Sequence, residues 1–201
     1  MLSRTADNIY WMARMVERAQ GVVRLLEAAY RMDRLPGGGA GWDPILTISG
    51  QIDGFKRKYD ELTSKNVLNF MIFDQDNPSS VFSCVKAGRE NTRSERSILP
   101  EEMFESINTT WIDMQGLYYD SLEQSGFYEF FEWVKDRTEL FRGQTVSMMV
   151  YDDAFQFARM GTYIERADFT ARLLDVKYHI LLPPDATDRG LIDYYQWGEM
   201  L

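Results

Sequence analysis

Apolar residues near the start of the chain recur at alternating intervals of three and four positions. They are Ile9, Met12, Val16, Ala19, Val23, Leu26 and Tyr30. This spacing lines one side of a helix with apolar side chains, because an α-helix has about 3.6 residues per turn. The pattern therefore predicts a long amphipathic helix, which Ser3 can cap and which should run to about Asp33, with this stripe facing a core.

The same pattern returns 148 residues later in the chain. The stretch VERAQGVVRLLEAAY, at 16–30, is matched by IERADFTARLLDVKY, at 164–178. The equivalent apolar positions of the second copy are Phe157, Met160, Ile164, Ala167, Ala171, Leu174 and Tyr178. We interpret the two segments, 9–30 and 157–178, as an internal duplication. Two helices with the same buried stripe are expected to pack against each other as a pseudo-twofold pair.

Charged residues beside the two stripes are duplicated as well. They are Glu17, Arg18 and Arg24 in the first copy and Glu165, Arg166 and Arg172 in the second. Charges on a solvated helix face usually diverge between copies, so these flanks are expected to contact protein. Two interpretations are open. The charges form partly buried ion pairs between the helices, or they form a polar site on the pseudo-twofold axis around Glu17 and Glu165.

The segment between the two copies has further helix signals and no alternating strand pattern. A capping residue followed by proline predicts helix starts at Asp43 and Asn77. The first of these helices is expected to reach about Leu62. Further helices are expected from Pro100 and from Phe127. We therefore predict an all-α fold, a bundle of about six or seven helices that contains the pseudo-twofold repeat.

Length, composition and charge narrow the class of protein. The 201 residues, 45% apolar and 26% charged, are typical of a single soluble domain over 1–201. The net charge of −9 argues against nucleic acid and anionic membranes as partners, and no apolar run has the length of a membrane span. The start of the chain lacks the pattern of a secretory signal, and one cysteine permits no internal disulfide. A cytoplasmic location is therefore expected.

Few residues of the chain could support catalysis or bind a metal. The one histidine is His179, the one cysteine is Cys84, and no Glu-x-x-His pattern exists. We therefore predict no zinc or di-iron site and no cofactor, and we expect Cys84 to pack in the core. Asp74 and Asp76 are the best local candidates for Mg²⁺ ligands, and a solvated turn explains them at least as well.

A cationic stripe and an aromatic tail also call for an explanation. Arg89, Arg93 and Arg96 recur at intervals of four and three, which places them on one side of a helix. They form either a salt-bridged surface or an anion clamp. The tail, 190–201, carries large apolar side chains that need a cover. It is expected to fold back onto the bundle or to bind another copy in a homo-oligomer.

Three stretches of the sequence carry a family resemblance. They are MLSRTADNIYWMARMVERA, DNPSSVFSCVKAGRENTRSER followed by EEMFESIN, and ERADFTARLLDVKYH. With them, over nearly its whole length, the chain resembles the bacterial alpha-E domain family, a domain of unknown function. The resemblance implies a helical protein encoded beside, or fused to, a circularly permuted ATP-grasp ligase, often with a transglutaminase-like cysteine peptidase. Members usually continue past a segment like YYQW, so a short or C-terminally truncated member is expected.

The resemblance directs attention to one candidate polar site. Its residues are Glu17, Arg18, Arg24, Arg89, Asn91, Arg93, Arg96, Glu165, Arg166 and Arg172. Our first hypothesis is a non-catalytic partner that docks on the ligase or the peptidase and positions a peptide. The alternative is an enzyme in which Glu17 or Glu165 is a general base and an arginine of the cationic stripe binds a carboxylate or phosphate. A homodimerisation module is the third hypothesis.

Overall fold

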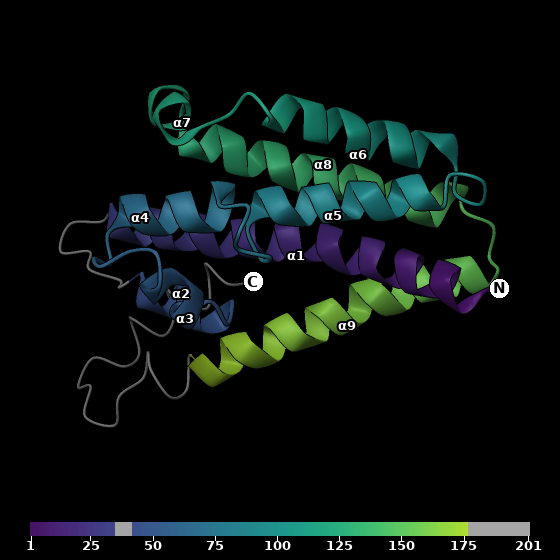
Figure 1. The fold of residues 1–201 in the computed structure, drawn as a ribbon, viewed down its shortest axis with the longest axis horizontal. Helices are drawn as coiled ribbons and strands as arrows, with labels where there is room; N and C mark the ends of the chain where they lie inside the picture. The colour runs from purple at the N-terminus through teal and green to yellow at the C-terminus, as the bar shows by residue number, and fades with distance from the viewer. Residues whose placement is uncertain (35–41, 177–201) are drawn as a thin grey trace.

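The computed structural model describes residues 1–34 and 42–176, which form helices joined by loops (Figure 1). The elements are α1 Ser3–Asp33, α2 Asp43–Ile48, α3 Ile52–Lys56, α4 Ser64–Leu68, the π-helical turn η1 Asn69–Phe73, α5 Val81–Ser94, α6 Glu101–Met114, α7 Tyr119–Ser125, α8 Phe127–Met148 and α9 Asp153–Val176. The predicted all-α fold is confirmed. The helices outnumber the predicted six or seven because several, such as α3 and α7, have only about one or two turns. Across these described ranges, no helix combines the length and apolarity needed to cross a membrane.

α1 is the central helix of the bundle. It packs on α5, α8 and α9, and α6 covers α5 and α8 from the outside. In Figure 1, α9 runs along one side of α1, while α6 and α8 lie on the other side. The amino group of Met1 lies 3.9 Å from the carboxylate of Asp153, at the start of α9. The two copies of the repeat are therefore neighbouring helices that run parallel.

The apolar stripe of α1 is buried, as the sequence pattern predicts. Its side chains from Ile9 to Leu26 are at most 6% exposed, and α5 and α8 cover them. Gly88 of α5 allows this close packing. A Cβ atom built on Gly88 would lie 3.2 Å from Cγ2 of Val16, so a larger residue would push α5 away from α1.

The prediction that α9 buries the same stripe is wrong. Met160 and Ile164 are both 42% exposed, and Ala167 and Ala171 are exposed as well. The buried residues of α9 are instead Ala154, Phe155, Ala158, Gly161, Glu165 and Val176. The physical reason is that α9 contacts α1 through the flank of its stripe, and no element in the described part of the chain covers the stripe itself. Tyr178, the last stripe position, lies outside the described residues.

Two predicted helix boundaries are also wrong, and local backbone chemistry explains both. The helix expected from Asp43 to about Leu62 is broken into α2 and α3, because Gly50 adopts a left-handed conformation with φ of 67°. Asn77 does not cap α5. Its Oδ1 accepts from the Ser79 backbone N–H at 2.9 Å, which forms a turn, and α5 begins later with Ser80 as the N-cap.

Candidate functional site

α1 and α9 approach each other closely at a pair of small residues. A Cβ atom built on Gly161 would lie 2.3 Å from the carbonyl oxygen of Tyr10 and 3.1 Å from Cβ of Ala13. Ala13 is the residue of α1 that corresponds to Gly161 in the duplication. Two turns further on, the ring of Phe169 lies over Gly21, its own counterpart, 3.1 Å from a Cβ built there. Equivalent positions of the two copies therefore form the contact.

The duplicated Glu-Arg dipeptides pair reciprocally across this contact. The guanidinium of Arg18 donates to both carboxylate oxygens of Glu165, at 2.6 and 3.0 Å. In the same way, Arg166 donates to both oxygens of Glu17, with the Nη2–Oε2 distance at 3.2 Å. Each glutamate of one copy thus binds the arginine of the other copy. Two-pronged pairs of this kind fix orientation as well as contributing attraction.

One additional arginine makes the two pairs unequal. Arg14 donates to Oε2 of Glu165 at 2.6 Å, whereas the position equivalent to Arg14 in the second copy is Thr162. Burial lowers the pKa of Arg14 and Arg18, but the hydrogen bonds to Glu165 and the attraction of its charge together outweigh that effect, so the pKa of both guanidiniums is raised. Glu165 is therefore a buried carboxylate held by two cations, while Glu17 is held by one.

Two hollows flank the paired dipeptides. The larger one is a groove of about 730 Å³ between α1, α8 and α9, and we call it the α1–α8–α9 groove. The smaller one, of about 220 Å³, lies between α1, α9 and the turn after α2. Glu165 and Phe169 line both. Arg172 lines only the smaller one, where it pairs with Asp168 at 3.1 Å.

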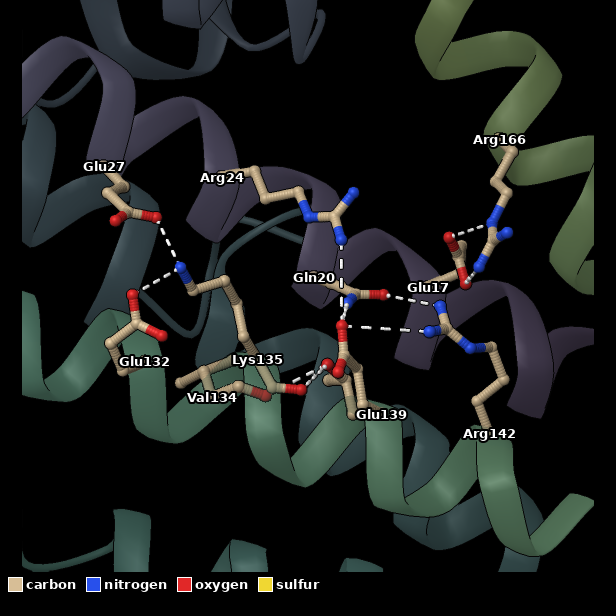
Figure 2. Close-up of polar contacts among 11 residues, drawn as sticks. Glu17, Gln20, Arg24, Glu27, Glu132, Val134, Lys135, Glu139, Arg142 and Arg166 are labelled. Atoms are coloured by element: carbon tan, nitrogen blue, oxygen red, sulfur yellow. Dashed lines mark hydrogen bonds and ion pairs between the residues drawn. The ribbon is translucent and has the colours of Figure 1, made fainter. Parts of the chain in front are cut away.

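One end of the α1–α8–α9 groove is organised around Glu139 of α8. Its Oε1 atom accepts a hydrogen bond from Nε2 of Gln20 at 3.1 Å. The guanidinium nitrogens of Arg24 and Arg142 both lie 3.8 Å from that same oxygen. Figure 2 shows these two arginines reaching toward Glu139 from α1 and α8. Gln20 also accepts from Arg142 at 3.2 Å, so the buried amide ties the two helices together.

The other end of the groove holds a lysine between acidic side chains. Lys135 donates to Glu27 of α1 and to Glu132 of α8, in each case at 2.7 Å (Figure 2). Burial lowers the pKa of Lys135, but the two hydrogen bonds and the charges of Glu132 and Glu27 together outweigh that effect, so the pKa is raised. Glu132 and the neighbouring Asp136 are exposed to solvent. This end of the groove carries three carboxylates, of Glu27, Glu132 and Asp136, and two cations, Lys135 and Arg31, whereas the Glu139 end carries the guanidiniums of Arg24 and Arg142.

The structure does not bring the cationic stripe of α5 to this groove. Arg89 donates to Asn108 of α6 at 2.7 Å. The other two arginines form ion pairs near the same helices, Arg93 with Glu90 and Arg96 with Glu101. Asn91 is half-buried on α5. The stripe thus faces the α6 side of the bundle, away from α9 in Figure 1, and it belongs to a salt-bridged surface.

Several polar residues of the groove escaped the sequence analysis. They are Gln20, Glu27, Lys135, Glu139 and Arg142; Arg14, which binds Glu165 outside the groove, was not predicted either. A signal for part of this set exists, because Lys135, Glu139 and Arg142 recur at intervals of four and three and so share one side of α8. That spacing shows a polar side of a helix, but it does not show that this side faces α1.

The remaining candidates for chemistry have structural roles. The ammonium group of Lys58 lies 2.8 Å from Asp74 and 3.4 Å from Asp76, so it takes the position that Mg²⁺ would need between these two carboxylates. In the described part of the chain, no three His, Cys, Asp or Glu residues cluster as metal ligands would. Cys84 is fully buried, as predicted, and burial raises its pKa to about 12. His179 lies outside the described residues.

Comparison with known proteins agrees with this geometry. The Alpha-E family model, described as "a predicted alpha-helical domain with a conserved ER motif", matches residues 1–201. No curated protein and no solved structure matches the chain. Glu-Arg dipeptides occur at 17–18, 95–96 and 165–166, and the first and third are the two that pair between α1 and α9. The chain belongs to the Alpha-E family.

Proposed function

We propose that the chain is a non-catalytic helical partner of a peptide-processing system. Its partners would be a circularly permuted ATP-grasp ligase and a transglutaminase-like peptidase, as the family resemblance implies. The observation that carries the proposal is the reciprocal pairing of the two Glu-Arg dipeptides. All four carboxylate oxygens of Glu17 and Glu165 accept hydrogen bonds from guanidinium groups that join α1 to α9. These glutamates therefore serve the architecture of the helix pair.

The outer face of α9 supports docking on another protein. This face consists of Met160, Tyr163, Ile164, Ala167, Ala171 and Leu174. The same stripe in α1 is covered by two helices of this chain. A helix face of this pattern usually packs on protein, and an exposed apolar stripe often marks an interaction site. Among the residues that the structure describes, nothing covers the stripe on α9, which supports docking of a partner there.

An enzymatic function finds less support in the geometry. That hypothesis needs Glu17 or Glu165 to share a cleft with Arg89, Arg93 or Arg96. The partners of these arginines lie on α5 or α6, on the other side of the bundle from α9: Asn108 for Arg89, Glu90 for Arg93 and Glu101 for Arg96. A base and its proposed anion clamp therefore do not converge.

Co-purification with a circularly permuted ATP-grasp ligase, the partner that the family resemblance implies, tests the proposal. We expect the tagged full chain to capture the ligase, and we expect Ile164→Glu to abolish capture because it places a charge on the outer face of α9. Leu140→Glu is the matched control, since Leu140 is a similarly exposed apolar residue on α8. Light scattering completes the test. A chain that never binds the ligase, or one whose outer face only joins two copies of itself, would contradict the proposal.

A further inference from the structure

The arrangement of Arg24 and Arg142 in the α1–α8–α9 groove has an unused capacity for hydrogen bonds. Both guanidiniums lie 3.8 Å from Oε1 of Glu139, which is too far for a hydrogen bond. Among the residues that the structure describes, Arg24 donates no hydrogen bond, and Arg142 donates one, to Gln20. Glu139 therefore holds two cations near each other, and most of their N–H groups have no hydrogen-bond partner among the described residues.

The separation of these guanidiniums suits one small anion. Because both Nη2 atoms are 3.8 Å from the same oxygen, they cannot be further apart than twice that distance. A carboxylate has two oxygens that each accept a charge-assisted hydrogen bond at about 2.8 Å, so it can bridge such a gap. Two arginines and Glu139 sum to a single positive charge. That charge favours a monoanionic carboxylate over a phosphate dianion.

The remainder of the groove suits the rest of a peptide. Apolar side chains of both repeat helices, including Leu25 and Leu173, line it. Acidic groups, Glu132 and Asp136, are exposed at the far end. Glu132 and Arg142 are ten residues apart on α8, or about 15 Å along the helix, which about four extended residues span. The volume of about 730 Å³ is within the range of ligand-binding sites.

We propose that the α1–α8–α9 groove binds a short peptide by its C-terminal carboxylate, which bridges Arg24 and Arg142 while the peptide's amino end lies near Glu132 and Asp136. Gln20 is a positioning residue, because its buried amide fixes Arg142 and Glu139 in place. The inference deepens the proposed function by naming the class of peptide that this partner protein would hold. It does not require the ligase to be present.

Calorimetric titration of the full chain with the tetrapeptide Ala-Leu-Ala-Leu tests this inference. We expect the free acid to bind, and its C-terminal amide to bind at least about tenfold more weakly, because charge-assisted hydrogen bonds are lost. Arg24→Gln and Arg142→Gln should each lower the affinity for the free acid by a similar factor. Glu139→Gln should strengthen it, since a competing carboxylate is removed. Arg137→Gln is the control, because Arg137 pairs with Asp113 of α6 outside the groove.

The same titration contains the outcomes that overturn the inference. Equal affinity for acid and amide, an unchanged affinity in Arg24→Gln, or no binding of the free acid would each do so. A C-terminally amidated peptide that carries a glutamate side chain and binds as tightly as the free acid would overturn the inference, because the groove would then recognise a side-chain carboxylate instead of the C-terminus. If acetate binds as tightly as the peptide, the groove recognises only a carboxylate and the proposal of a peptide ligand is wrong. Unfolding midpoints show that the variants are folded. If the chain does not capture the ligase but still binds the free-acid peptide more tightly than the amide, the proposed function is wrong and the inference about the groove stands.

Discussion

The two reciprocal ion pairs are related by sequence but should differ in energy. Glu165 is 4% exposed and its arginines, Arg14 and Arg18, are 15% and 21% exposed. Glu165→Gln keeps the shape and removes the charge, which leaves two partly buried guanidiniums without a counter-ion. Removing one member of a buried pair costs about 3–5 kcal/mol. Because both arginines keep some contact with water, we expect the lower end, about 3 kcal/mol.

Glu17→Gln is the matched comparison. Its partner Arg166 is 41% exposed, so water can solvate the guanidinium once the charge is gone. Exposed pairs contribute at most about 1 kcal/mol. For a chain of this size, the expected losses correspond to about 6–12 °C in Tm for Glu165→Gln and about 2–4 °C for Glu17→Gln.

Urea unfolding followed by circular dichroism measures the difference in the free energy of unfolding. Repetition at about 1 M salt, where the Debye length is about 3 Å, should shrink the loss in Glu17→Gln and largely preserve the loss in Glu165→Gln. Equal losses for the two variants, or a larger loss for Glu17→Gln, would refute the argument that burial and the additional Arg14 distinguish the pairs.

Two further predictions concern packing and pH. Gly161→Ala should destabilise the chain by about 1–3 kcal/mol, since its Cβ atom would collide with the carbonyl of Tyr10. Gly143→Ala, whose Cβ would meet nothing within 4 Å on α8, should stabilise it by about 0.5–1 kcal/mol; unfolding midpoints that fail to move in opposite directions would contradict this. Cys84 has a pKa of about 12 in the fold instead of 9.0, so only the unfolded chain loses this proton between those pH values. The free energy of unfolding should therefore fall as the pH rises through this range, and the fall should be steeper in the parent chain than in Cys84→Ala by about 1.4 kcal/mol per pH unit. Equal slopes for the two chains would show the reasoning to be wrong.

Sequence periodicity could predict the helices better than it could predict their neighbours. The stripe of α1 predicted one long helix and its burial, because a long helix at the centre of a bundle has to bury its apolar side; Ser3, expected as its cap, is instead its first residue and makes no cap hydrogen bond. The equivalent stripe of α9 is largely exposed from Met160 to Leu174, because periodicity shows which side is apolar and does not show what covers it. Gly50 illustrates a second limit, since a single left-handed residue divides a segment whose composition permits one helix.

The candidate site could be predicted where the duplication itself encodes it. Persistence of Glu17 and Arg18 as Glu165 and Arg166 indicated interhelical contact, and the structure contains both ion pairs. The groove could not be predicted in this way. Its polar groups on α8 have no copy in the repeat, and their meeting with Gln20 and Arg24 depends on how α8 packs on α1.

Reciprocal pairing gives the Glu-Arg dipeptides a role beyond attraction. In parallel helices, a shift of α9 by one turn along α1 would break both pairs at once, whereas unpaired apolar contacts could be re-formed in the new position. The two dipeptides therefore fix the register of the helices. That register sets where Phe169 and Leu173 of α9 face α1, and so it determines the shape of the groove that Arg24 also lines. The motif then contributes to binding by positioning the walls of the site, with its own charges already paired.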